Sequence, residues 1–556
     1  MIASTRTIPV LLVLALVSAC ATSSTQPPIP VTGSFVPATS TARPLAVAVP
    51  CENRFMPYAL PFTTEIAGPP YEVLDGNGSG MALGDLDGDG RTDIVLGNLD
   101  GPNAIFWNLG NWHFRRQTFG EGGLRSVTIV DVDGDSLLDI VGAHRYAKPI
   151  LWHNTGNADR QQRFVQTSLP DVNNPAYALD WADFDGDGNL DLVAGSYDTE
   201  LLKHEGMIFT QRGNGVGVFV YMRRGNTYIS QRLAEQADAL AIALPDVNGD
   251  GRPDIMIGND FNRPDYVFVQ KGDGWEKSMP FSRITENTMS LALGDIDNSG
   301  SSAIFAADMK PYHKDTLTMA EWLPMMKRLT KPLSADDPQN AENALQIQGA
   351  DGRWHDVAYE RMIDSSGWSW SSKFGDLDND GFLDLYVVNG MLARGLFDHL
   401  PNQELVEQNL AFHNDTHGGF QPAPQWGLGL TASGRSMSMV DLNEDGRLDI
   451  VINNVGSPAM VLENRLCGGQ AIEVDLNWNG TNNRSAIGAH LALQTSVGML
   501  TRDVTASSGY LSGDSTRVHF GVPDSATIGQ LSVRWPDGSI SMVDPPQIQT
   551  LVTVTR

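Results

Sequence analysis

The chain has 556 residues, of which 41% are apolar, and its formal net charge is −28. This apolar share is ample for sizeable cores, and the acidic balance argues against nucleic acid as a partner because its phosphates would be repelled. Six bound divalent cations would offset about 12 of these negative charges.

Residues 1–19 predict an export signal. Arg6 supplies a short basic region, and the apolar stretch 8–17 is too short to span a membrane comfortably. The four residues that end at Cys20 resemble a bacterial lipobox, which implies that Cys20 is lipidated. The alternative is an ordinary signal peptide cleaved near Ala19 or Ala21. Ala21 follows the cysteine, so the resemblance implies an outer-membrane lipoprotein if the source is Gram-negative, with the periplasmic and outer faces both open.

Residues 20–50 predict a flexible tether. They are rich in Ser, Thr, Pro and Ala, carry almost no charge and cannot bury a core. We therefore expect the mature protein to hang from a membrane surface by its lipid anchor. We expect no transmembrane helix after the tether.

The stretch 85–93 reads Asp-Leu-Asp-Gly-Asp-Gly-Arg-Thr-Asp. Side-chain oxygens at loop positions 1, 3, 5 and 9, with the backbone carbonyl at position 7, can wrap one hard cation such as Ca²⁺. An apolar run follows at once, so the loop joins β-strands and differs from an EF-hand. The candidate ligands are Asp85, Asp87, Asp89, Arg91 and Asp93.

Six further copies of this pattern follow, at spacings that predict an array of similar units such as a propeller. The alternative interpretation of a single copy is a solvated Asp-Gly turn. Seven copies in the same register with their flanking strands disfavour this alternative. In five copies the candidate ligands are Asp131, Asp133, Asp135, Leu137 and Asp139; Asp183, Asp185, Asp187, Asn189 and Asp191; Asp246, Asn248, Asp250, Arg252 and Asp254; Asp376, Asp378, Asp380, Phe382 and Asp384; and Asp441, Asn443, Asp445, Arg447 and Asp449.

The copies differ in the number of carboxylate ligands that they offer. Asn248 and Asn443 each keep an oxygen but lose a charge, so binding there should weaken and persist. The copy at 295–303 is predicted to be weak, because only Asp295, Asp297 and Ser299 remain and Ala303 replaces the last Asp. The sequence thus predicts about six Ca²⁺ sites.

Strands with small residues precede these loops, apolar strands follow them, and hairpins with aromatic residues complete units of four strands. These features resemble the FG-GAP/VCBS repeats of integrin-α-type propellers over most of residues 55–466. The resemblance implies an all-β chain with a seven-bladed β-propeller at 51–467 and Ca²⁺ in the loops of individual blades.

The ring is expected to close through its two ends. The last unit lacks its final strand, and the segment that begins at Leu60 resembles the outer strand of another unit at 279–284. The N-terminal segment should therefore complete the last blade and bring Cys51 near Cys467. Because export permits oxidation, we expect a disulfide between these two cysteines.

Residues 308–350 are expected to interrupt the array between the fifth and sixth blades. Met319, Trp322 and Met325 fall at helical spacing. The helix is either a short amphipathic element packed on the propeller or a lid or partner-binding element.

Trp368 and Trp370 lie in the strand before the loop at 376, where alternate residues share one face. They either fill the core or stack on a sugar ring.

Residues 468–556 predict a small β-sandwich, because short strands with period-two alternation replace the Asp loops. The motifs at 483–489, 508–512 (Ser-Gly-Tyr-Leu-Ser), 517–521 (Arg-Val-His-Phe-Gly) and 533–538 resemble, in this order, the ASPIC/UnbV domain. One departure is Ala486, where the family usually has Gly.

Four polar residues of this domain are either a binding site or structural pairs with carboxylates. They are Arg484, Arg517, His519 and Arg534.

Function is not fixed by any motif, since the chain has no Walker loop, no Gly-x-Ser-x-Gly and no His-Glu-x-x-His. The first hypothesis is a lipid-anchored binding or adhesion module that recognises a glycan or an envelope protein. The alternative is a lyase or hydrolase acting on a polysaccharide in the propeller funnel, and a third is a structural part of an envelope complex. A buried Arg/His/Tyr cluster in the funnel would favour catalysis, and an exposed aromatic platform would favour binding.

Overall fold

The computed structural model describes residues 33–68, 72–205, 215–261, 263–272, 274–329, 337–416 and 418–556. The expected export signal, Cys20 and the first part of the expected tether lie outside these residues. Seven sheets each contain four strands in the antiparallel order of a propeller blade.

The blades follow one another along the chain, and the strands of each run in order from the centre of the ring to its rim. Blade one is β3 (Met81–Gly84), β4 (Asp93–Leu96), β5 (Asn103–Asn108) and β6 (Phe114–Phe119). Blade two is β7 (Leu124–Val130), β8 (Asp139–His144), β9 (Ile150–Asn154) and β10 (Phe164–Thr167), and blade three is β11 (Ala178–Ala182), β12 (Asp191–Gly195), β13 (Val218–Arg224) and β14 (Thr227–Ala234). Blade four is β15 (Ala239–Ala243), β16 (Ile255–Asn259), β17 (Tyr266–Lys271) and β18 (Gly274–Ser278), and blade five is β20 (Ser290–Gly294), β21 (Ala303–Ala307), β24 (Ala344–Gln348) and β25 (Trp354–Asp356). Blade six is β26 (Gly367–Gly375), β27 (Asp384–Asn389), β30 (Leu410–Asn414) and β31 (Phe420–Pro422), and blade seven is β32 (Gly434–Val440), β33 (Asp449–Asn454), β34 (Pro458–Arg465) and β2 (Arg54–Thr63).

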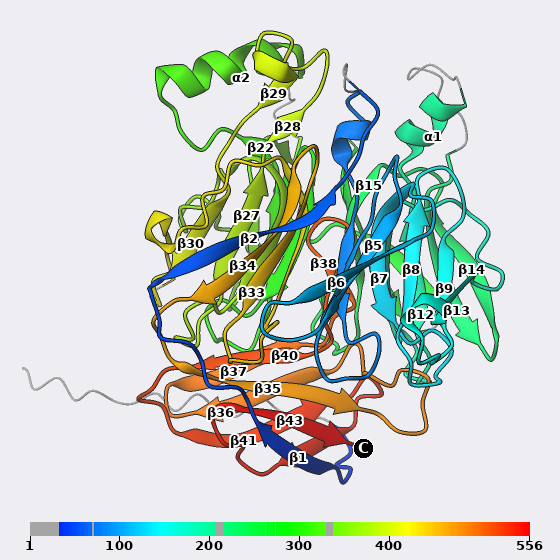
Figure 1. Ribbon diagram of the computed structural model, residues 1–556, viewed down its shortest axis with the longest axis vertical. Helices are drawn as coiled ribbons and strands as arrows, with labels where there is room; N and C mark the ends of the chain where they lie inside the picture. The colour runs from blue at the N-terminus through cyan, green and yellow to red at the C-terminus, as the bar shows by residue number, and fades with distance from the viewer. Residues whose placement is uncertain are drawn as a thin grey trace, which may run out of the picture. The chain divides into compact units, whose positions relative to one another are not determined.

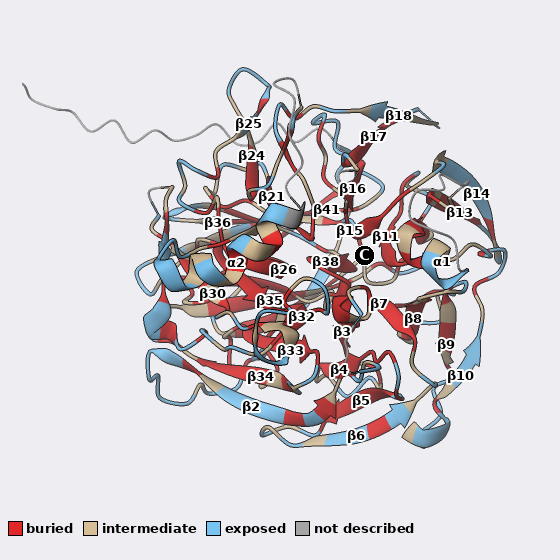
Figure 2. Ribbon diagram, turned by 90° about the horizontal axis from the view of Figure 1, so that it is seen from above, coloured by how far each residue is buried: buried red, intermediate tan, exposed pale blue. Residues whose placement is uncertain are grey.

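The first strand of each blade lies at the centre of a closed ring (Figure 2). β3 contacts β7, β7 contacts β11, and the series continues through β15, β20, β26 and β32 back to β3. Small residues let these strands converge, and β15, for example, reads Ala-Leu-Ala-Ile-Ala and is fully buried. The fold is therefore the all-β, seven-bladed propeller that the sequence predicts.

The two ends of the chain close the ring at blade seven. β2, from the N-terminal segment, pairs antiparallel with β34 and places Phe55 opposite Asn464. Cys51 and Cys467 form a disulfide with their Cα atoms 5.1 Å apart. The predicted closure and the predicted disulfide are both present.

The C-terminal residues form the β-sandwich of two sheets, and β1 (Thr39–Pro44) from the N-terminal segment adds a fourth strand to one of them. Val474 and Phe520 of one sheet and Leu491 and Leu531 of the other belong to one buried apolar cluster. The first sheet is β1, β43 (Thr550–Thr555), β35 (Gln470–Asn477) and β40 (Val518–Val522), and the second is β37 (Gly498–Asp503), β36 (His490–Thr495), β41 (Ile528–Arg534) and β42 (Ile540–Val543).

The predicted tether at 20–50 is wrong for its described part. β1 pairs antiparallel with β43 along the edge of the C-terminal sandwich, with Arg43 opposite Leu551 (Figure 1). The physical reason is that an open sheet edge offers unpaired backbone groups, which a polar extended segment can satisfy. Leu45, just beyond β1, is buried.

The predicted position of the insertion at 308–350, between the fifth and sixth blades, is also wrong. Its last residues are β24, the third strand of blade five, so the inserted segment lies within that blade between β21 and β24. The segment contains α2 (Thr316–Leu329). The predicted boundary is wrong because β24 pairs with a strand that lies about 40 residues earlier in the chain.

α2 is an amphipathic helix packed on the propeller, as the first interpretation predicts. Trp322 is fully buried, lies 5.7 Å from the ring of Trp368 and donates its indole N–H to Glu407. Trp368 and Trp370 are both buried, which confirms core filling. The remaining elements are α1 (Asp198–His204), β19 (Ile284–Thr285), β22 (Met309–Lys310), β23 (Gln339–Asn340), β28 (Met391–Leu392), β29 (Glu404–Leu405), β38 (Ser507–Ser508), β39 (Ser512–Gly513) and the short 3₁₀ turns at Asp75–Asn77, Arg160–Gln162, Pro401–Gln403 and Pro424–Trp426.

Candidate metal centres and the central channel

Each acidic loop joins the first strand of a blade to the second, and we name it by its blade. The loops of blades one to seven are 85–93, 131–139, 183–191, 246–254, 295–303, 376–384 and 441–449.

The blade-one loop turns around the side chain of Asp85. Its carboxylate accepts hydrogen bonds from the N–H groups of Gly88 and Gly90, each at 2.8 Å. These glycines have φ angles of 76° and 91°, a region that glycine occupies without the steric cost that other residues meet. Asp93, the ninth residue, opens β4 and accepts a bond from the N–H of Asn108 at 2.8 Å. The backbone thus fixes both ends of the acidic set.

In the loops of blades two, three, four, six and seven, the first aspartate again accepts a hydrogen bond from the N–H of the sixth residue. The blade-two loop carries Ser136 where the others have Gly, and its φ of 73° confirms that the loop needs a left-handed residue there. The ninth residue is held by the third strand of its blade through Asn154 N–H to Asp139, Arg223 N–H to Asp191, Gln270 N–H to Asp254, Asn414 N–H to Asp384, and Asn464 N–H to Asp449.

The electrostatics of these loops fit a bound cation. Burial raises the pKa of Asp93 and of Asp191 to about 8, and neighbouring loop carboxylates add to the rise. Asp87, Asp378 and Asp445 each have one buried carboxylate oxygen to which no described residue donates a hydrogen bond. Converging, buried and under-satisfied carboxylates are what a hard cation such as Ca²⁺ requires.

The blade-seven loop has a carboxylate that the sequence pattern did not reveal. Glu463 in β34 is buried, and one of its oxygens has no donor among the described residues. Burial, with a smaller contribution from nearby Glu463, raises the pKa of Asp445. The other oxygen of Glu463 pairs with Arg465 at 2.8 Å and accepts a hydrogen bond from the hydroxyl of Tyr58 at 2.7 Å. Only the place of Glu463 directly before Asn464, which holds the ninth residue, could have signalled this carboxylate.

The blade-five loop satisfies its two carboxylates with protein groups. Asp295 accepts bonds from the N–H groups of Ser299 and Gly300 and from the hydroxyl of Thr501, each at 2.8 Å. Asp297 forms a two-point ion pair with Arg361. Because protein groups already pair with both carboxylates, this loop needs a bound ion less than the other loops do. The sequence analysis likewise predicts a weak site here.

All seven loops lie against the C-terminal sandwich, a placement that the sequence did not predict. The contacts come from residues of several strands and turns of that domain. Hydrogen bonds join Arg517 to Gly90 O, Asn483 N–H to Gly188 O, Arg534 to Gly251 O, Thr501 to Asp295, Gly469 N–H to Asp378 O and His519 to Gly446 O, and Asn482 lies against Gly134.

The four polar residues of the C-terminal domain have structural partners. Arg517 pairs with Asp475 at 3.1 Å, and Arg484 lies 3.4 Å from the amide oxygen of Asn479. His519 and Arg534 bond to loop carbonyls. The predicted pairing with a carboxylate is thus present for Arg517, while the other three residues bond to an amide oxygen or to backbone carbonyls.

A segment of the C-terminal domain lies at the centre of the propeller ring, among the innermost strands, and we call residues 507–513 the central plug (Figure 2). β39 pairs parallel with β3, so that Ser512 lies opposite Met81. Gly509 N–H donates to Leu291 O at 2.8 Å. Tyr510 is fully buried, and its hydroxyl bonds to Tyr177 at 2.8 Å. The plug contacts the innermost strands of blades on opposite sides of the ring.

A buried Arg/Tyr cluster surrounds the plug. Arg125 forms a fully buried ion pair with Glu200. Arg435 donates to the carbonyls of Gly76, at 2.6 Å, and Gly390, at 3.0 Å, and lies over the ring of Trp370. Burial lowers the pKa of Arg435 to about 9. These residue types are those that the sequence analysis expects of a catalytic funnel. The polar groups of Arg125 and Arg435 are bonded to other parts of the propeller, and Tyr177 bonds to Tyr510 of the plug.

Two family models match this chain in the places that the fold indicates. The model for the FG-GAP-like repeat matches residues 85–142, 131–194 and 246–306, and the model for ASPIC and UnbV matches residues 479–556. The chain carries FG-GAP-like repeats and an ASPIC and UnbV domain. The FG-GAP and ASPIC/UnbV resemblances drawn from the sequence are confirmed.

The chain is also similar to cartilage acidic protein 1. It is 32% identical over 133 residues to the protein of Xenopus tropicalis and 30% identical over 137 residues to that of Homo sapiens. Each match covers 21% of this chain, and the chain spans only about a fifth (20%) of the length of these curated relatives.

Among solved structures, the chain is similar to that titled "Crystal structure of BBS1N in complex with ARL6DN, soaked with mercury". The TM-score is 0.38 at 8% identity, over 69% of this chain and 92% of that chain. Within the described residues, none of the helices has the length and apolar character needed to cross a bilayer.

Proposed function

We propose that the protein is an extracytoplasmic binding or adhesion module whose propeller is stabilised by about six bound cations, chiefly Ca²⁺. The FG-GAP-like repeats and the similarity to cartilage acidic protein 1 support the binding role. The disulfide between Cys51 and Cys467 supports an oxidising compartment. A lipid anchor at Cys20 would hold the module to the outer membrane, facing either the periplasm or the outside.

The observation that carries the binding role is the filled channel. A funnel enzyme needs open space among its polar residues, whereas the central plug and its Arg/Tyr cluster are buried and mutually bonded. This arrangement weighs against the alternative of a polysaccharide lyase or hydrolase with its site in the funnel.

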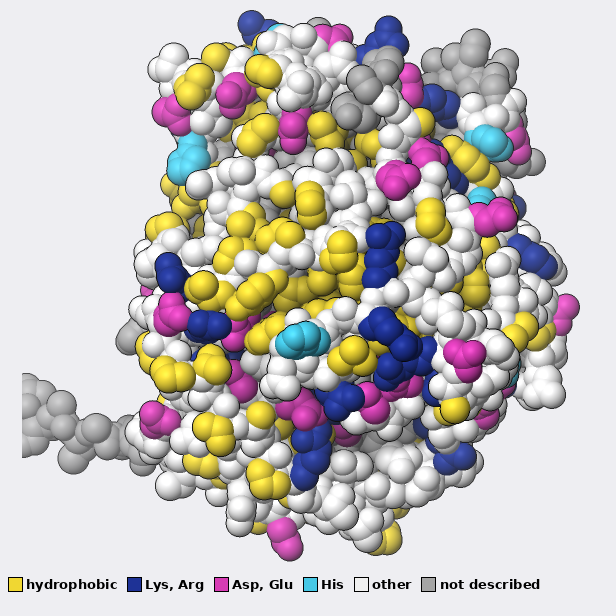
Figure 3. Space-filling view, in the orientation of Figure 1, with side chains coloured by type: hydrophobic (Ala, Val, Ile, Leu, Met, Phe, Trp, Pro, Cys, Tyr) yellow, Lys and Arg dark blue, Asp and Glu magenta, His cyan; other side chains and the backbone are white. Residues whose placement is uncertain are grey.

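A surface aromatic pair, formed by exposed Tyr58 and partly buried Trp112, supports binding at the outer side of the ring. Tyr58 in β2 is 38% exposed, and its ring stacks on Trp112 at 5.7 Å. On the face drawn in Figure 3, apolar side chains gather in a band over β2 and β34, with Lys and Arg side chains beside it. Aromatic faces flanked by cationic groups can bind a glycan, including an acidic one, or an acidic protein surface.

The test is a binding and cleavage assay on a panel of polysaccharides and envelope proteins. We expect retention of at least one partner with no shortening of any polymer, and a loss of affinity of about tenfold in the Tyr58→Ala, Trp112→Ala double variant, since aromatic contacts are worth about 1 kcal/mol or more each. Tyr359→Ala is the matched control, because Tyr359 is exposed and lies elsewhere. Shortened polysaccharide chains in the assay would overturn the proposal.

A further inference from the structure

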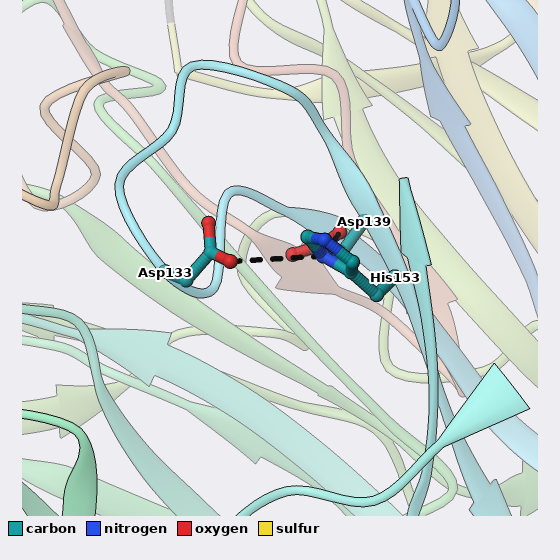
Figure 4. Close-up of side chains that lie close together, drawn as sticks. All are labelled: Asp133, Asp139 and His153. Carbon is teal, nitrogen blue, oxygen red and sulfur yellow. Dashed lines mark hydrogen bonds and ion pairs between the residues drawn. The ribbon is translucent and has the colours of Figure 1, made fainter. Parts of the chain in front are cut away.

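A histidine side chain points into the blade-two loop. His153 lies in β9, and its Nδ1 atom is 3.1 Å from Asp139 Oδ1 and 3.6 Å from Asp133 Oδ2 (Figure 4). Both aspartates are candidate ligands of that loop, at positions 9 and 3. The loop therefore offers a nitrogen ligand in addition to its oxygens.

The blade-six loop also has a histidine beside it, which approaches through its other ring nitrogen and a different pair of loop positions, 3 and 5. His413 lies in β30, and its Nε2 atom is 3.2 Å from Asp378 Oδ2 and 3.7 Å from Asp380 Oδ2. One oxygen of Asp378 and the Nε2 atom of His413 are buried without a hydrogen bond from the described residues. The ring of Trp426 packs against the imidazole at 5.4 Å and fixes its orientation.

The two histidines occupy equivalent positions in their blades. Each directly precedes the asparagine whose N–H holds the ninth loop residue, Asn154 or Asn414. At this position blades one, three, four and seven have Trp107, Met222, Val269 and Glu463. None of these side chains is a nitrogen ligand, and the four differ from one another. The imidazole is thus a property of two loops and not of the repeat.

The shorter nitrogen–oxygen distance in each loop, 3.1 Å and 3.2 Å, is that of two ligands on one first-row metal ion, and the longer distances, 3.6 Å and 3.7 Å, lie just above that range. Two ligands bonded at about 2.1 Å lie about 3.0 Å apart at an octahedral ion and about 3.4 Å apart at a tetrahedral one. In each loop the imidazole nitrogen and two carboxylate oxygens lie within 4.8 Å of one another. Imidazole is a preferred ligand of Zn²⁺ and its first-row neighbours, whereas Ca²⁺ selects oxygen.

We propose that the blade-two and blade-six loops bind a first-row transition-metal dication of the Zn²⁺ or Co²⁺ class through His153 and His413, while the loops of blades one, three, four and seven bind Ca²⁺. This inference rests on the proposed function, because it requires that the loops bind cations. It divides one array of similar repeats into two chemically different kinds of centre.

The competing role for each histidine is that of a counter-ion. The Asp378 and Asp380 carboxylates raise the pKa of His413 to about 10, so a protonated ring could balance the loop charge where no ion is bound. The two roles predict opposite effects of removing the ring. A ligand strengthens the binding of a transition metal, whereas a counter-ion competes with every cation.

The test is a titration of chelator-treated protein with Co²⁺, followed by its visible absorption bands, alongside calorimetric titration with Ca²⁺. We expect two Co²⁺ centres with nitrogen ligation in the natural chain. In the His153→Gln, His413→Gln double variant we expect Co²⁺ binding to weaken at least about tenfold and Ca²⁺ binding to the other loops to be unchanged. His355→Gln is the matched control, because His355 pairs with Asp351 at 3.1 Å outside the loops.

Each outcome decides a different claim. Unchanged or tighter Co²⁺ binding in the double variant would overturn the inference and assign the histidines to the counter-ion role. If the natural chain bound neither Co²⁺ nor Ca²⁺, the proposed cation-stabilised module would fail as well. Thermal unfolding of each variant in Ca²⁺ checks that the propeller is intact.

Discussion

At the scale of single residues, Gly521 shows how closely the C-terminal domain approaches a metal loop. A Cβ atom at this position would overlap the carboxylate of Asp376 and lie 2.6 Å from Asn379 Cα. We expect Gly521→Ala to lower the free energy of unfolding by about 1–3 kcal/mol, as overpacking does, and to weaken the blade-six cation site. Denaturant unfolding and calorimetric titration measure both effects. The control is Gly274→Ala, where the nearest atom would be Lys271 O at 3.8 Å; equal behaviour of the two variants would contradict this prediction.

The same residues show what sequence reasoning reaches at this scale. The ligands of each loop lie within nine consecutive residues, so their spacing alone predicts the shared geometry of Asp85 and Asp93. His153, His413 and Glu463 come from the third strand of their blades, 14 or more positions beyond their loops' last residue. Their approach depends on strand register, which no short motif contains.

At the scale of elements, α2 is anchored to the propeller by two buried side chains of one core cluster, Trp322 and Met325. Trp322 packs on Trp368 and bonds to Glu407, whereas neighbouring Leu323 is 41% exposed. We expect Trp322→Ala to release the helix, because removing a buried Trp costs about 3–5 kcal/mol. Limited proteolysis should then cut within 308–343 much faster, with cation binding unchanged. Leu323→Ala should behave like the natural chain, and protection of the segment in Trp322→Ala would count against this anchoring role.

Elements are predictable where their signal is local. The helical spacing around Trp322 indicates α2, and small residues before each loop indicate the inner strands. The sequence pattern places β24 in the insertion and β1 in the tether, because each becomes a strand only by pairing with a distant segment. Polar or short stretches of this kind have no periodicity that separates a strand from a linker.

At the scale of the whole molecule, the C-terminal domain connects the acidic loops to the centre of the ring. The C-terminal domain rests on all seven loops and sends the central plug into the ring. Met81 and Ser512, which pair across the plug, are 431 positions apart in the chain. The family resemblances predicted both domains but could not predict this contact, since each domain's own motifs are satisfied without it.

This architecture couples cation binding to the seating of the plug. Without cations, the buried carboxylates of each loop repel one another beneath the C-terminal domain, so the loops should loosen and release the contacts of Gly188, Gly251 and Gly446 carbonyls with that domain. We expect chelation to speed amide hydrogen exchange in residues 505–514 by about tenfold or more, and to speed exchange in β15 less, because a loss of about 1.4 kcal/mol of local stability gives that factor. Mass spectrometry of deuterium uptake with Ca²⁺ and with chelator measures both segments. Equal acceleration of both would mean that cations stabilise the ring as a whole, and unchanged exchange in the plug would show that the C-terminal domain is held by its protein contacts alone.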